Sequence, residues 1–152
     1  MSAEARLQEL GLELPEPPDP VASYVTFVRT GNLVYTSGHG PMLTDGKFVA
    51  GKVGVDLDID AGREAARITG IGLLSTLRHN LGSLDRVTSV VKVLGMVNCP
   101  PDFTDHPSVI NGCSELLVDV FGELGRHARS AVGVGSLPMN IAVEIEVIVE
   151  VA

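Results

Sequence analysis

The sequence predicts a single α+β domain, in which two helices cover one face of a mixed β-sheet. Its 152 residues are enough for one domain with a substantial core. Two segments carry apolar residues at every third or fourth position, which is the period of a helix. Other segments are rich in β-branched residues, and the last one alternates apolar and acidic residues with the period of a strand.

The N-terminal part divides into a leading segment and the start of the domain. Residues 1–20 are expected to form a small helix followed by a proline-rich extended stretch, whereas residues 21–152 form the domain itself. Two strands, at 24–29 and 33–37, flank a turn that contains glycine and asparagine. A third, short strand is expected around residues 48–49, after another turn.

Each of the two apolar stripes has recognisable ends. The first helix is expected to start near Asp58 or Asp60, because carboxylates suit the positively polarised start of a helix. Gly82 is placed to end it. The second helix is expected to run from Pro107, a residue that fits the first helical position, to Gly125.

The C-terminal segment, residues 127–152, predicts a hairpin that places one arginine and one glutamate on the same face. Apolar residues at the odd positions from 143 onward alternate with glutamates. If Val132 and Val134 face the core from the preceding strand, Arg129 and Glu144 share the opposite face. An ion pair of Arg129 with Glu144, or with an acid on another subunit, is the structural alternative to a binding role.

The other face of the sheet has no helix left to cover it. A β-branched strand at 88–97 completes the predicted order β-β-β-α-β-α-β-β. The uncovered face is expected to carry Ala131, Gly133, Ala142 and Ile148, and such an apolar face is rarely left in water. We therefore expect it to pack against other copies of the chain.

Composition excludes several classes of partner. The net charge is −8, and the 11 basic residues form no run, which argues against a nucleic-acid surface. The chain shows neither the pattern of a signal peptide nor an apolar stretch long enough to span a membrane, so a cytoplasmic location without membrane contact is expected.

The cysteines and histidines predict no metal site. Cys99 and Cys113 lack the paired spacings of a disulfide framework and are expected to be structural thiols in a reducing compartment. The spacings of His79, His106 and His127 do not suggest zinc binding. Neither a metal nor another cofactor is expected.

Motifs at both ends of the domain match a known pattern. They are Arg129-Ser130 with the valine-rich strand after it, Leu137-Pro138, Val143-Glu144-Ile145-Glu146, the segment Leu33 to Gly38, and the strand Val87 to Val97. Together they resemble the reactive-intermediate deaminase family (RidA/YjgF), over roughly Ser23 to Ala152. The resemblance implies a chorismate-mutase-like α+β fold and a homotrimer with sites in the clefts between subunits.

The resemblance also implies a reaction and the residues that perform it. Arg129 would bind the carboxylate of a small 2-imino or enamine acid, and Glu144 would orient the attacking water. The products are a 2-keto acid and ammonia, and the hydrolase uses no cofactor. An arginine suits this task because its planar fork matches a carboxylate.

Five further residues are expected to contact the substrate. Tyr24, Gly38 and Asn111 lie at or near positions of the family's site, and Ala131 would contribute a main-chain contact. His39 follows Gly38 and is a candidate acid, base or hydrogen-bond donor, with an uninvolved loop histidine as the alternative.

The sequence departs from the family pattern around these positions. Thr26, His39 and Ala131 replace the residues usual there, which indicates a divergent subgroup with a reshaped pocket. The alternative function is therefore a non-catalytic trimeric module that binds small carboxylates or a metabolic partner protein. A ribonuclease is disfavoured by the acidic composition.

Overall fold

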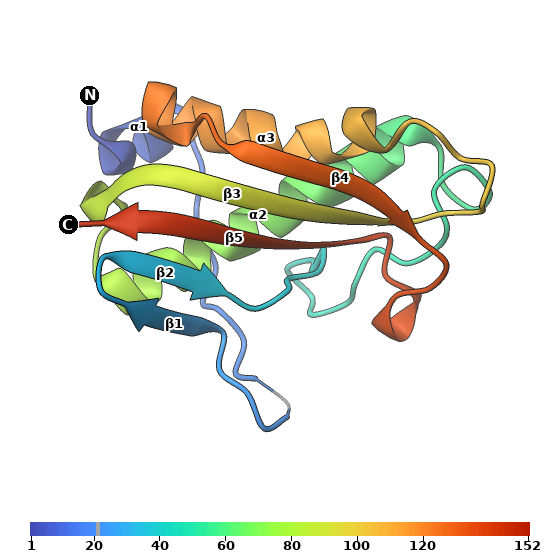
Figure 1. Ribbon diagram of the computed structural model, residues 1–152, viewed down its shortest axis with the longest axis horizontal. Coiled ribbons are helices and arrows are strands. Elements are labelled where there is room, and N and C mark those ends of the chain that lie inside the picture. Colours follow the sequence, from blue (N-terminus) through green and yellow to red (C-terminus); the bar gives the residue numbers. More distant parts are fainter. Residues whose placement is uncertain (21) are drawn as a thin grey trace.

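A mixed sheet backed by helices on one face forms the body of the protein (Figure 1). The computed structural model describes residues 1–20 and 22–152. The strands are β1 (Phe27–Thr30), β2 (Leu33–Thr36), β3 (Val87–Asn98), β4 (Ala128–Val134) and β5 (Val143–Val151). Their order across the sheet is β1-β2-β5-β3-β4, with β3 and β4 parallel and the other neighbours antiparallel. The predicted α+β class and mixed sheet are confirmed.

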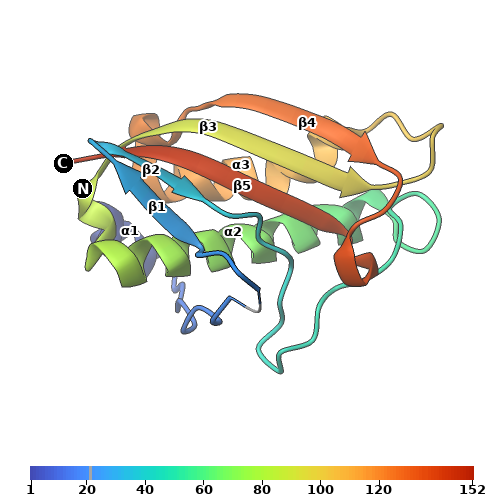
Figure 2. The ribbon, with the colours of Figure 1, turned by 60° about the horizontal axis from the view of Figure 1, so that its bottom comes forward.

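Two long helices, α2 (Ile59–Leu81) and α3 (His106–Phe121), lie side by side under the sheet (Figure 2). Both predicted ends of α2 are confirmed. The Asp58 side chain accepts a hydrogen bond from the Ala61 amide at 2.8 Å, and Gly82 ends the helix with a φ of 84°. Helix α3 stops at Phe121, and the remaining residues to Gly125 form a 3₁₀ turn. The short α1 (Ala3–Glu9) packs against α3.

The strand predicted around residues 48–49 is absent from the described chain. Phe48 pairs with Met42 through one isolated bridge. The backbone of Val49 hydrogen-bonds to Pro41 and Ala142 instead. This segment crosses between several neighbours and follows none of them long enough to form a strand.

The predicted C-terminal hairpin is wrong, because β3 lies between β4 and β5. The chain leaves β4 and passes over the end of β3 before it enters β5 (Figure 1). Asn98, at the end of β3 and fully buried, holds this crossing in place. Its amide donates to the Asn140 side chain at 3.0 Å and to the Ile141 carbonyl at 3.1 Å.

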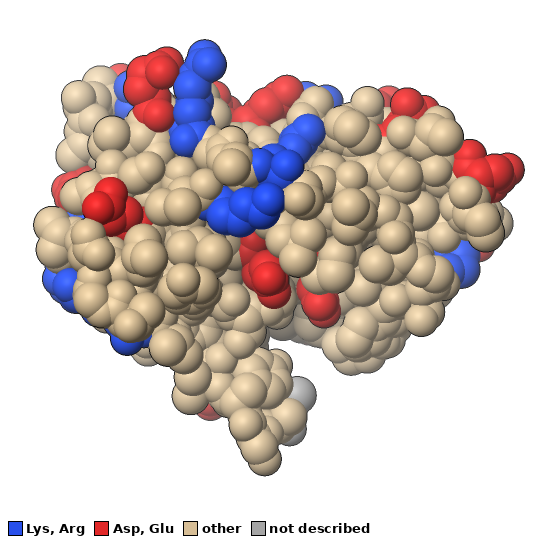
Figure 3. Space-filling view, viewed as in Figure 1, with Lys and Arg blue, Asp and Glu red and all other residues tan. Residues whose placement is uncertain are grey.

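One face of the sheet packs on the helices and the other is open. The core side carries aliphatic residues of β3 and β5 such as Val93, Val97 and Ile145, all fully buried. No helix of the described chain covers the opposite face, as predicted. Figure 3 shows that most of this face is uncharged, with a group of acidic and basic side chains near its middle. It displays Val28, Tyr35, Leu94, Met96, Val132 and Ile148.

The residues predicted for the open face are mostly wrong. Ile148 does lie there, opposite Lys92, but Ala142 is fully buried. Ala131 pairs with Gly95 and shares its orientation toward α3, and Gly133 follows on the same side. The sequence pattern placed Val132 in the core because it is apolar, whereas it is 42% exposed on the open face.

The close approach of α2 and α3 depends on Gly112. A Cβ at this position would lie 2.0 Å from the Arg63 carbonyl oxygen, a backbone atom that cannot rotate away. Gly72 on α2 is a matched control, because the nearest atom to its Cβ would be 4.0 Å away.

We expect Gly112→Ala to lower the free energy of unfolding by about 3 kcal/mol or more, because the helices must separate. Gly72→Ala is expected to raise it by up to about 1 kcal/mol, since alanine favours a helix. Urea denaturation followed by circular dichroism measures both. Equal stability of the two variants would contradict the packing described above.

Candidate functional site

The guanidinium of Arg129 is held by neutral side chains of α3. Arg129 lies on the edge strand β4, pairs with Val93 and shares its orientation toward the helices. Its Nη1 donates to Asn111 Oδ1 at 2.8 Å and to Ser114 Oγ at 3.2 Å. The structure therefore brings together Arg129 and Asn111, two of the predicted site residues.

No carboxylate of the described residues neutralises this guanidinium. None of the ion pairs formed within residues 1–20 and 22–152 includes Arg129, so the predicted alternative of a pair with Glu144 inside one chain is wrong. Within the same residues, Nε and Nη2 of Arg129 donate no hydrogen bond. A half-buried cation with two parallel donors to spare suits a planar anion such as a carboxylate.

Glu144 lies on the opposite face of the sheet from Arg129. Glu144 pairs with Met96 on β3, and Arg129 pairs with Val93 on the other side of that strand. Val93 and Met96 are three residues apart, an odd number, so their side chains point to opposite faces. The prediction that Arg129 and Glu144 share a face is therefore wrong.

Glu144 packs against Gly38 on the open face. A Cβ at position 38 would lie 2.8 Å from the carboxyl carbon of Glu144, so a side chain there would displace this carboxylate from its present position. Partial burial, together with the neighbouring Glu146, raises the pKa of Glu144. A carboxylate with a raised pKa is a better proton acceptor for a water molecule.

His39 points away from this carboxylate and toward α2. Its Nδ1 lies 2.7 Å from the Ser37 carbonyl oxygen and its Nε2 lies 2.8 Å from Thr76 Oγ1. Burial lowers the pKa of His39, so the ring is neutral near pH 7. Both ring nitrogens are engaged within the chain, which favours the structural alternative over substrate binding.

The remaining predicted residues occupy separate places. Ala131 lies on β4, two residues beyond Arg129 and on the same side of the strand. Tyr24 precedes β1 and is 48% exposed. In the part of the chain that the structure describes, the Tyr24 hydroxyl forms no hydrogen bond to another predicted site residue, and the methyl group of Ala131 has no polar atom to form one.

Sequence reasoning missed two residues next to Arg129. Ser114 Oγ lies 2.9 Å from His127 Nε2, and His127 Nδ1 lies 2.6 Å from the Gly125 carbonyl oxygen. The spacing could have indicated both residues, because His127 is two residues before Arg129, immediately ahead of β4, and Ser114 is about one helical turn after Asn111.

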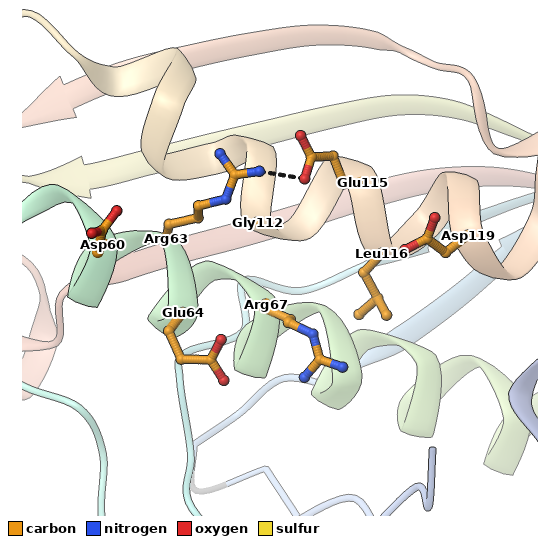
Figure 4. Close-up of a pocket in the computed structure, with 8 residues that line it drawn as sticks. All are labelled: Asp60, Arg63, Glu64, Arg67, Gly112, Glu115, Leu116 and Asp119. Carbon is orange, nitrogen blue, oxygen red and sulfur yellow. Dashed lines mark hydrogen bonds and ion pairs between the residues drawn. The ribbon is translucent and has the colours of Figure 1, made fainter. Parts of the chain in front are cut away.

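A hollow between α2 and α3 contains none of the predicted residues (Figure 4). Charged side chains of both signs line it, and Arg63 pairs with Glu115 across it. It lies on the helix side, away from the open face of the sheet. In the described residues, no cluster of three or more histidine, cysteine or acidic side chains could hold a metal ion. None of the helices described is long and apolar enough to cross a membrane.

Residues 4–151 match the family described as "YjgF/chorismate mutase-like, putative endoribonuclease", and the chain belongs to this family. It is 43% identical over 147 residues to protein TCP17 of Trypanosoma cruzi, which covers 96% of this chain and 92% of that protein. It is 30% identical over 139 residues to the 2-iminobutanoate/2-iminopropanoate deaminase of Dermatophagoides farinae, covering 91% and 93% of the two chains. The crystal structure of Atu1372 from Agrobacterium tumefaciens, a protein of unknown function, has a TM-score of 0.91 and 44% identity, covering 99% and 92%.

We expect Glu144→Gln to raise the free energy of unfolding at pH 7. The raised pKa of Glu144 means that its ionised form is disfavoured in the folded state, so the wild type loses stability as pH rises through that pKa. Glutamine stays neutral and removes the loss. Urea denaturation at pH 7 and at pH 4 measures the free energy of unfolding of the wild type and the variant, with Glu123→Gln as an exposed control. A difference between wild type and variant that is as large at pH 4 as at pH 7 would contradict the explanation.

Proposed function

We propose that the protein hydrolyses small 2-imino or enamine acids to 2-keto acids and ammonia. The observation that carries the proposal is the half-buried guanidinium of Arg129, held by neutral partners and with two donors available for a carboxylate. A relative named as a 2-iminobutanoate/2-iminopropanoate deaminase, similar along most of the chain, supports the same reaction. The two buried free thiols suit a reducing compartment, and we place the reaction in the cytoplasm.

The site is proposed to form between two copies of the chain. Arg129 and Glu144 lie on opposite faces of one sheet and cannot both reach one small substrate within a single copy. The open face is largely apolar and is suited to pack against further copies in a homotrimer. In this arrangement, the β4 edge of one copy, with Arg129 and Asn111, meets Glu144 and Gly38 on the open face of the next.

The chemistry requires one carboxylate anchor and one base. Arg129 binds the substrate carboxylate, which fixes the adjacent imine carbon. Water attacks this carbon while Glu144 accepts a proton from the water. Glu144 passes this proton to the imine nitrogen, which gives a neutral carbinolamine. Glu144 then accepts the hydroxyl proton of the carbinolamine and delivers it to the amine nitrogen as the C–N bond breaks and the C=O bond forms, so the products are a 2-keto acid and ammonia.

A non-catalytic module that binds small carboxylates is the second candidate. The placement of His39 favours it, because a titratable group expected at the site is engaged with Thr76 in the core instead. The two candidates share Arg129 as the anion site and differ in turnover.

We expect the wild type to accelerate release of 2-oxobutanoate from imine generated by a threonine dehydratase. Arg129→Ala is expected to reduce kcat/KM by about 100-fold, the loss of a bidentate charged contact. Arg129→Lys should reduce kcat/KM less than Arg129→Ala does, because lysine keeps the positive charge. Arg126→Ala, at an exposed arginine paired with Glu123, is the control. If the protein binds the keto acid but releases 2-oxobutanoate from the imine no faster than buffer does, the deaminase proposal fails and the non-catalytic binding module is the function.

A mixture of two inactive variants tests whether the site is shared. Co-expressed Arg129→Ala and Glu144→Gln chains are expected to recover about a quarter of wild-type activity, because random mixing gives that share of interfaces both native residues. Mixing purified variants without subunit exchange is the control. Activity no higher than that of either variant alone would show that each copy contains its own complete site.

A further inference from the structure

A chain of hydrogen bonds runs from the backbone of the 3₁₀ turn Gly122–Gly125 to the guanidinium of Arg129. The Gly125 carbonyl oxygen can only accept, so His127 Nδ1 must donate to it across 2.6 Å. In the neutral ring, Nε2 then carries a lone pair and accepts the Ser114 hydroxyl proton across 2.9 Å. Burial and the nearby Arg129 charge lower the pKa of His127, which keeps the ring in this neutral form.

This order of donors determines what Ser114 offers to Arg129. Because the hydroxyl proton points to His127, the lone pairs of Ser114 Oγ are left for Arg129 Nη1, 3.2 Å away. Asn111 Oδ1 accepts from the same Nη1 at 2.8 Å. Two acceptors on one nitrogen fix the plane of the guanidinium and leave the edge formed by Nε and Nη2 for a ligand.

The groups that hold Arg129 are all uncharged, and this bears on what the guanidinium can bind. A carboxylate in place of Ser114 would hold the guanidinium just as firmly but would neutralise it and compete with an anionic ligand. Hydroxyl, amide and neutral imidazole groups orient the cation and leave its charge unpaired. Among the residues that the structure describes, no acid forms an ion pair with Arg129.

We propose that Ser114 and His127 are positioning residues that orient Arg129 for a carboxylate without neutralising it. The proposal rests on the function proposed above and adds two residues to its anion site. Neither side chain needs to touch the reacting atoms, so their loss should weaken substrate binding more than turnover.

Binding of 2-oxobutanoate, followed by calorimetry, tests this role. Ser114→Ala and His127→Phe are expected to raise Kd and KM about tenfold with little change in kcat, the loss of a hydrogen bond to a charged group. Ser114→Thr keeps the hydroxyl and His127→Gln keeps an acceptor, so both should bind like the wild type. Ser114→Asp should abolish binding, because its carboxylate takes the place of the ligand. Ser108→Ala, on the same helix, is the control.

A measurement without ligand separates this proposal from the proposed function. We expect slow exchange of the Arg129 Nη1 protons, which Asn111 and Ser114 accept, by NMR in the wild type, and faster exchange in Ser114→Ala and His127→Phe. If Arg129→Ala leaves keto-acid binding unchanged, the proposed function fails. The exchange rates still test whether Ser114 and His127 position the guanidinium of Arg129. Unchanged exchange and unchanged Kd in both Ser114→Ala and His127→Phe would overturn the positioning role.

Discussion

Strand β4 lies at the edge of the sheet, parallel to β3, with Val93 opposite Arg129 and Gly95 opposite Ala131. This register turns Arg129 toward α3, where Asn111 and Ser114 accept its hydrogen bonds. The pairing of β5 with β3 places Glu144 on the other face of the sheet. The position of Arg129 and its separation from Glu144 therefore follow from these two strand pairings, and the proposal of a site shared between copies rests on them.

The two halves of the candidate site are built in opposite electrostatic ways. Arg129 is held by uncharged groups, so its positive charge remains available to a ligand. Glu144 is half-buried beside Gly38 and near another glutamate, which favours its protonated form and makes it a stronger base. In the proposed reaction, the substrate carboxylate is the partner of Arg129 and the attacking water is the partner of Glu144.

The fold class and most element bounds could be predicted from the sequence, because they depend on local patterns. The carboxylate of Asp58 and the left-handed Gly82 mark the ends of α2 through contacts within a few residues. The uncovered sheet face followed from counting the helices. The short strand at 48–49 could not be excluded in this way, since a strand exists only if a neighbour pairs along its length.

The sequence by itself determined the family and, through its motifs, the two residues proposed to carry the chemistry: Arg129 and Glu144, whose types suit a carboxylate and a water. Only the tertiary structure decided which face each residue occupies, because β3 enters between β4 and β5, which are consecutive in sequence. Alternation along a strand gives relative orientation within that strand alone, and its relation to the next strand depends on pairing and register. For the same reason His39 turned to the core and Ser114 met His127, contacts that long-range packing creates.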